Sequence, residues 1–160
     1  MDNQELEQLY QKALDLAARQ LSYRALSTGA LRDKLLAAGI PEDAADWAVA
    51  WMQERGLLDD AAYAAGVRRS YERRGYGELR IRQELRRRGV GTETAESALD
   101  EYEADLGRMS ALLDKRLHGD LSDRKEVQKA VAALQRRGYQ WDDIRAALKA
   151  YGAQIDDDFS

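Results

Sequence analysis

The chain has no cysteine, one proline, one phenylalanine and one histidine among its 160 residues. The lack of cysteine excludes disulfides and thiolate metal ligands and is compatible with a reducing compartment. The single histidine, His118, has no second histidine or cysteine to complete a transition-metal site. We therefore expect no metal or other cofactor, and we interpret His118 as an exposed loop residue.

Long apolar runs are also missing. No run approaches the roughly 20 residues needed to cross a bilayer. The first residues, Met1-Asp-Asn-Gln-Glu-Leu-Glu, are acidic where a signal peptide would be basic and then apolar. The sequence therefore predicts a cytoplasmic protein without a membrane partner. No apolar heptad seam is left over, which favours a monomer.

The residues needed for catalysis are scarce. No glycine-rich loop ends in Lys-Ser or Lys-Thr, so the chain has no phosphate cradle for ATP. The acidic pairs Asp59-Asp60 and Asp142-Asp143 could be imagined as Mg²⁺ ligands, but both lie where helices are expected to start. Helix capping or a favourable helix-dipole position explains them better. We predict that the protein is not an enzyme.

Helix-forming residues and a repeated pattern dominate what is present. Apolar residues recur at spacings of three and four, and nothing alternates with a period of two, so we predict an all-α fold. Three helical runs end in a glycine followed by an apolar residue, at Gly39, Gly89 and Gly138, spaced by 50 and 49 residues. Each predicts a helix C-terminus with a left-handed glycine. The matched apolar positions keep their register: Leu35/Leu85/Leu134, Ala45/Ala95/Ile144, Ala48/Ala98/Ala147 and Val49/Leu99/Leu148.

These signals predict an elongated tandem array of three three-helix units with a repeat of about 50 residues and three small cores. The expected units are residues 1–59, the Arg-rich 60–106 and 107–152, followed by a frayed acidic tail, 153–160. Expected helices include 92 to near 105 and 141–151. We expect Trp47, Trp51 and Trp141 to lie in the cores, and Tyr76 and Tyr139 to pack beside their glycines.

Positive charge is concentrated in the second unit. The net charge of the chain is −4, yet residues 66–90 contain nine arginines and three glutamates, and residues 93–105 contain six acids and no base. A solvated face is the ordinary reading of a charge run. Glu84 is the only near partner on its helix turn, so we expect several unpaired guanidinium groups, suited to carboxylates or phosphates. The candidate partner-binding residues are Arg68, Arg69, Arg73, Arg74, Arg80, Arg82, Arg86, Arg87, Arg88, Arg136 and Arg137.

Several motifs occur together in this chain. They are Asp60-x-x-Tyr63-Ala64, then Arg74-Gly-Tyr-Gly followed by Arg80-Ile-x-x-Glu-Leu and Gly89-Val90, and Leu134-Gln-Arg-Arg-Gly-Tyr139. Together these motifs resemble the RecX family of regulators of the RecA recombinase. The resemblance covers about residues 13–151. It implies a protein of homologous recombination, DNA repair and the SOS response. It also implies binding in the groove of the RecA filament on DNA and inhibition of its ATPase, coprotease and strand-exchange functions.

Two hypotheses remain open at this point. The first is a non-catalytic regulator that binds lengthwise to a RecA filament. The second is a stand-alone DNA-binding module, in which the Arg-rich helix contacts the phosphates of single- or double-stranded DNA. The salt dependence of DNA binding without RecA distinguishes them.

Overall fold

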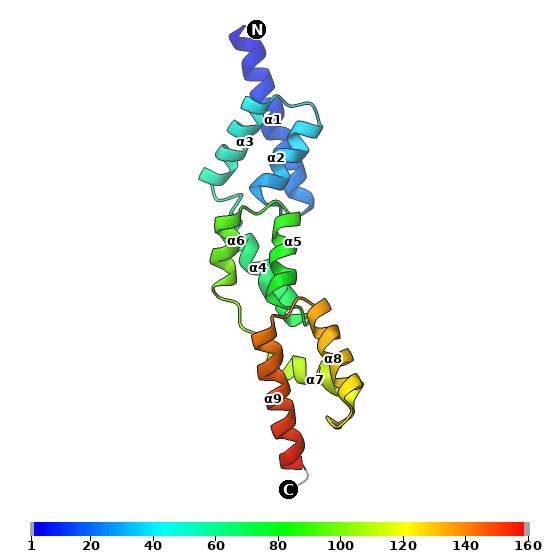
Figure 1. Ribbon diagram of the computed structural model, residues 1–160. Helices are drawn as coiled ribbons and strands as arrows, with labels where there is room; N and C mark the ends of the chain where they lie inside the picture. The colour runs from blue at the N-terminus through cyan, green and yellow to red at the C-terminus, as the bar shows by residue number, and fades with distance from the viewer. Residues whose placement is uncertain (1, 159–160) are drawn as a thin grey trace. The chain divides into compact units, whose positions relative to one another are not determined.

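A computed structural model describes residues 2–158, with side chains as far as residue 153. This part of the chain forms nine helices and no strand, which confirms the all-α prediction (Figure 1). We call the three successive helix triplets repeats 1, 2 and 3. Their helices are α1 (Asn3–Tyr23), α2 (Thr28–Ala37) and α3 (Glu42–Glu54); α4 (Asp60–Arg73), α5 (Glu78–Arg87) and α6 (Thr92–Leu99); and α7 (Leu106–Leu117), α8 (Arg124–Arg136) and α9 (Trp141–Asp158).

The second helix of every repeat ends in the same way. Gly39, Gly89 and Gly138 have φ angles of 89°, 81° and 91°, in the left-handed region that favours glycine. The residue after each glycine donates its N–H to a carbonyl five residues earlier, as in Val90 to Leu85 at 3.0 Å. This is the Schellman arrangement, so the predicted left-handed glycine caps are confirmed.

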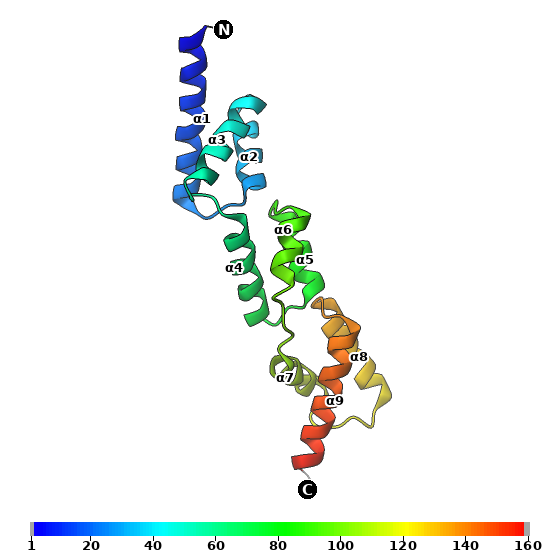
Figure 2. The same cartoon turned by 90° about the vertical axis from the view of Figure 1, so that its left-hand side faces the viewer.

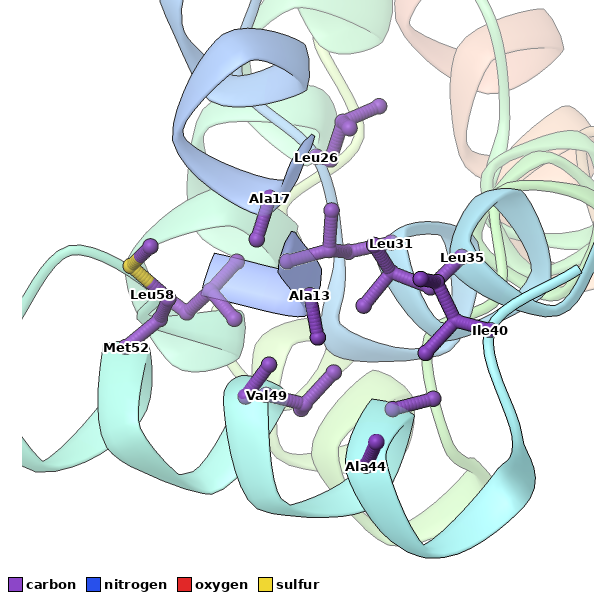
Figure 3. Close-up of a cluster of buried hydrophobic side chains, with 12 residues drawn as sticks. Ala13, Ala17, Leu26, Leu31, Leu35, Ile40, Ala44, Val49, Met52 and Leu58 are labelled. Carbon is purple, nitrogen blue, oxygen red and sulfur yellow. The ribbon is translucent and has the colours of Figure 1, made fainter. Parts of the chain in front are cut away.

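Repeat 1 has its own core. Helices α1, α2 and α3 contact one another, and Figure 3 shows the buried side chains that meet between them. The small residues Ala13 and Ala17 face α3, and Leu31 and Leu35 of α2 fill the space beside them. Ile40, which follows the capping glycine, is buried in the same cluster. The glycine cap therefore turns its apolar neighbour back onto the core.

Repeat 3 repeats this arrangement with larger residues. Helices α7, α8 and α9 contact one another (Figure 2). Met109, Leu113, Leu134 and Ile144 are fully or almost fully buried in one cluster. Tyr139, which follows the capping glycine, is also buried there, as predicted. Its burial raises the pKa of its hydroxyl.

The matched apolar positions behave alike across the three repeats. The leucine four residues before each capping glycine is buried throughout, and so are the first two matched positions of the third helices. The last matched position is buried as Val49 and Leu99, whereas Leu148 is only partly buried. The register read from the sequence therefore identifies positions that face the interior.

The chain divides into two compact units whose boundary runs through repeat 2. Unit 1 comprises residues 1–66 with 84–98, and unit 2 comprises residues 67–83 with 99–160. Unit 1 therefore holds repeat 1 together with the end of α5, and unit 2 holds repeat 3 together with the start of α5. Each unit is described by itself below.

Two helix ends differ from the prediction. Helix α6 ends at Leu99 rather than near residue 105. The acids that follow would lie at the negative end of a longer helix, and Asp105 instead caps α7 by accepting from Arg108 N at 3.0 Å. Helix α9 continues to Asp158, where a frayed tail was predicted. Residues 159–160 of that tail lie outside the described residues.

Candidate arginine-rich binding site

The contacts between successive repeats, which we call repeat junctions, position several of the candidate arginines. In unit 1 the start of α2 contacts the end of α5: the Ser27 hydroxyl donates to the Arg88 carbonyl at 2.5 Å and accepts from Ala30 N at 3.0 Å. Beside it, Asp60 accepts from both the backbone N–H and the hydroxyl of Thr28, at 2.9 and 2.7 Å. Asp60 thus joins two repeats, whereas its neighbour Asp59 caps α4, as predicted, by accepting from Ala62 N.

In unit 2 the start of α5 contacts the end of α8. Gly77 donates its N–H to the Arg137 carbonyl at 2.9 Å, and Leu79 donates to the Gly138 carbonyl at 3.0 Å. A Cβ on Gly77 would lie 2.3 Å from the backbone N of Tyr139, so only glycine permits this approach. The side chain of Gln140 donates to Glu78 at 2.9 Å.

Four of the candidate arginines form ion pairs along their own helices. Residues three or four apart share a helix face, which explains each pair. Glu84 is the partner that the sequence indicates, and the structure adds Glu72 and Glu78 as two further partners. The pairs are Arg68–Glu72 at 2.8 Å, Arg82–Glu78 at 3.1 Å, Arg87–Glu84 at 2.5 Å and Arg88–Glu84 at 2.7 Å.

Glu84 is a buried carboxylate held between two cations. Its side chain is only 6% exposed. Hydrogen bonds from Arg87, opposed by burial and assisted by Arg88, lower its pKa from 4.5 to about 2. Glu84 therefore stays ionised and fixes the two guanidinium groups at the end of α5. Arg88 also donates to the Tyr63 hydroxyl at 3.4 Å.

The remaining seven candidates carry no ion pair within the described side chains. They are Arg69, Arg73, Arg74, Arg80, Arg86, Arg136 and Arg137, all exposed except the partly buried Arg137. The expectation of several unpaired guanidinium groups is therefore met.

Three of these arginines surround one aromatic ring in unit 2. The guanidinium carbons of Arg74, Arg80 and Arg137 lie 5.4, 5.4 and 5.2 Å from the centre of the Tyr76 ring. Arg137 also donates to the carbonyls of Arg74 and Gly75, at 3.3 and 3.1 Å. The electron-rich ring face attracts the cations without neutralising them. The Tyr76 cluster, as we call these four residues, therefore presents uncompensated positive charge.

The tryptophan prediction is wrong for two of the three residues. Trp47 is 41% and Trp141 is 49% exposed, while Trp51 is partly buried. Trp47 packs edge-on against Tyr10 with ring centres 5.0 Å apart, and Arg145 lies 5.7 Å from the Trp141 ring. Helical spacing shows that these tryptophans lie on the third helices. It does not show that the small residues beside them, rather than the rings, fill the core.

The residues considered as possible metal ligands do not form a site. His118 is exposed, as predicted, and ends α7 in the left-handed conformation with φ 51°. Asp142 and Asp143 lie in the first turn of α9. Within residues 2–158, no three histidine or acidic side chains are grouped in a way that could hold a metal ion. No helix among those residues has the length and apolarity required to cross a membrane.

A tandem three-helix repeat protein with an arginine-rich middle repeat is the class that this geometry defines. Residues 13–52, 59–99 and 103–148 match, in order, the first, second and third three-helix domains of RecX. Together the matches span most of the chain, so the chain belongs to the RecX family.

Two relatives agree with this assignment, and a solved structure shares the fold. The regulatory protein RecX of Stenotrophomonas maltophilia (strain R551-3) is 37% identical over 141 residues, covering 87% of this chain and 84% of that protein. The regulatory protein RecX of Escherichia coli O7:K1 (strain IAI39 / ExPEC) is 35% identical over 151 residues, covering 85% and 89%. The crystal structure of RecX from Lactobacillus salivarius has a TM-score of 0.84 at 23% identity, covering 91% of this chain and 97% of that one.

Proposed function

We propose that this chain is a non-catalytic regulator that binds the RecA nucleoprotein filament along its groove. There it would inhibit the ATPase, strand-exchange and coprotease activities of RecA. Family membership supports regulation through RecA, and the relatives are named regulatory proteins. The proposal includes a monomer acting in the cytoplasm, in DNA repair, homologous recombination and the SOS response.

The uncompensated charge of the Tyr76 cluster is the observation that carries this proposal. Guanidinium groups that lack carboxylate partners are available for bidentate bonds to acidic side chains or phosphates. Both groups occur on a filament of protein and DNA. Bound in the groove, the protein would block the second DNA and restrain the movement between protomers that ATP turnover requires.

The matching experiment measures RecA ATPase on single-stranded DNA with increasing amounts of this protein. We expect Arg74→Glu with Arg80→Glu to raise the concentration for half-inhibition by about tenfold or more, because reversed charges repel an anionic surface. The control is Arg116→Glu with Arg124→Glu, which makes the same charge change at exposed residues of repeat 3. Equal inhibition by both double variants would remove the Tyr76 cluster from the mechanism.

The alternative is a stand-alone DNA-binding module. The arginines at the end of α5 support it, because guanidinium groups bind phosphates through paired hydrogen bonds. If the protein alone binds DNA at low micromolar strength, with affinity falling steeply as salt rises, the module is favoured. If DNA binding requires RecA, the regulator is favoured.

A further inference from the structure

Arginines occur at equivalent positions in the two repeat junctions. Arg24 and Arg74, 50 residues apart, each follow the first helix of a repeat. Arg87 and Arg88 close the second helix of repeat 2, and Arg136 and Arg137 close that of repeat 3 after 49 residues. In repeat 1, whose second helix end receives no such junction in the described structure, the matching residues are Ala37 and Ala38. Arginines therefore occur at the second-helix ends that take part in a junction and not at the one that does not.

In unit 1 the three arginines line one pocket. Arg24, Arg87 and Arg88 enclose a space of about 430 Å³ together with Tyr63 and the apolar side chains of residues 25, 26 and 30. Glu84 fixes Arg87 and Arg88, and Arg88 donates to the Tyr63 hydroxyl. The Arg87 side chain remains 71% exposed. The donors are thus oriented by the protein while the pocket stays open to solvent.

In unit 2 two of the equivalent residues lie beside Tyr76. Arg74 and Arg137 both face its ring, and the hydrogen bonds from Arg137 to the carbonyls of Arg74 and Gly75 hold the two segments together. Arg136 is exposed beside them in the chain. In each unit, therefore, the arginine after a first helix and the arginine before a capping glycine come from two repeats and meet at one place.

A cation in the last turn of a helix offsets the helix dipole, and this explains one arginine at each end. It does not explain why arginines from two different repeats face one pocket. Several guanidinium groups that converge on one pocket suit a phosphate group, whose tetrahedral oxygens can be approached from more directions than the two coplanar oxygens of a carboxylate.

We propose that both repeat junctions are phosphate-binding sites, one formed by Arg24, Arg87 and Arg88 and the other by Arg74 and Arg137. The phosphate belongs either to a nucleic-acid backbone or to a small phosphorylated ligand. This proposal rests on the DNA-binding alternative above and names the residues that would hold the phosphate. If the wild type binds DNA and the site variants bind it equally well, the junction sites are wrong while the alternative stands.

The experiment uses the full chain, a fluorescein-labelled dT15 oligonucleotide in an anisotropy titration, and inorganic pyrophosphate as the free competitor. Arg24→Gln and Arg74→Gln are each compared with Arg19→Gln, an exposed arginine on α1 that lines neither site. We expect each site variant to bind at least threefold more weakly than the control. We also expect each to reduce the slope of log K against log salt by about one, because one phosphate contact is lost.

Competition separates the two sources of phosphate. Displacement of the oligonucleotide by pyrophosphate from the wild type, but not from the site variants, indicates a small phosphorylated ligand. Binding that depends on Arg24 and Arg74 for the oligonucleotide alone indicates a nucleic-acid backbone. Equal binding by Arg24→Gln, Arg74→Gln and Arg19→Gln overturns the proposal. Displacement of the oligonucleotide by poly-glutamate as effectively as by pyrophosphate also overturns it, because the sites would then not prefer phosphate to carboxylate. Circular dichroism at 222 nm checks that every variant is folded.

Discussion

The molecule has one junction between repeats 1 and 2 and another between repeats 2 and 3. Each joins the start of the second helix of one repeat to the end of the second helix of the next, but the two junctions use different chemical groups. Ser27 and Gly77 each precede the second helix of a repeat and each bond to the carbonyl before the capping glycine of the next repeat. Ser27 uses its hydroxyl, whereas Gly77 uses its backbone N–H. The geometry of a repeat is thus preserved even though its contacting groups change.

The difference follows from how closely the backbones approach. At the second junction a Cβ on Gly77 would meet backbone atoms of Tyr139 at 2.3 and 2.4 Å. At the first junction the close approach occurs at Gly29, whose added Cβ would lie 2.5 Å from the Gly89 carbonyl oxygen. A serine is therefore tolerated at position 27 and excluded at position 77, because backbone atoms cannot move aside as a flexible side chain can.

The largest expected effect is that of Gly77→Ala. The added methyl group would force α5 away from Tyr139 and break the bond to the Arg137 carbonyl, so we expect a loss of more than about 3 kcal/mol in the free energy of unfolding. Urea denaturation followed by circular dichroism measures it. Gly107→Ala is the control, because its Cβ would meet only Asp105 Oδ1 at 3.4 Å within a helix. A small effect of Gly77→Ala would show that the approach of the backbones is not needed.

A second prediction concerns pH and separates the two junctions. The folded pKa of Glu84 is about 2 against an ordinary 4.5, so its stabilisation is fully present above the unfolded pKa and is lost as pH falls from about 5 to 2. This corresponds to about 3 kcal/mol. In the second junction Arg137 bonds to carbonyls that do not titrate.

We therefore expect the wild type to lose stability steeply in this acid range and Glu84→Gln to lose less of it, starting from a stability lower by about 2 to 3 kcal/mol. Denaturation midpoints at pH 7, 5 and 3 give the comparison. Glu126→Gln, an ion-paired but more exposed glutamate of α8, is the control. Parallel pH profiles of the wild type and Glu84→Gln would contradict the prediction.

The smallest expected effect is that of Ser27→Ala. The substitution removes the bond to the Arg88 carbonyl and the cap of α2 without introducing a clash, so we expect a loss of about 1 to 2 kcal/mol. Ser22→Ala, at an exposed hydroxyl near the end of α1, serves as the control. A loss from Ser27→Ala as large as that from Gly77→Ala would mean that the junctions do not differ in the way the contacts indicate.

Local rules explain what could be predicted. A left-handed glycine and its apolar neighbour specify a helix end from a few adjacent residues, and the three caps followed. Spacings of three and four placed Leu35, Leu85 and Leu134 inside. The same rules wrongly predicted that Trp47 and Trp141 are buried and made α6 too long. Residue spacing does not reveal how a third helix packs, nor that Asp105 caps α7.

The candidate site was predicted only in part. The charge run and several unpaired guanidinium groups could be read from the composition of residues 66–90. Arg24 was missed, although its equivalence to Arg74 at the repeat spacing was an available signal. The approach of Arg137 to Tyr76 and the role of Asp60 between repeats could not be predicted, because the residues that they bond to are 32 to 63 residues away along the chain.

The sequence by itself determined the repeat, its register, the three glycine-capped helix ends and the matched apolar positions, because helical periodicity and glycine conformation act over a few residues. Only the tertiary structure decided which helix ends meet, which arginines are bound by glutamates and which surround a tyrosine, because these depend on neighbours brought together from different repeats.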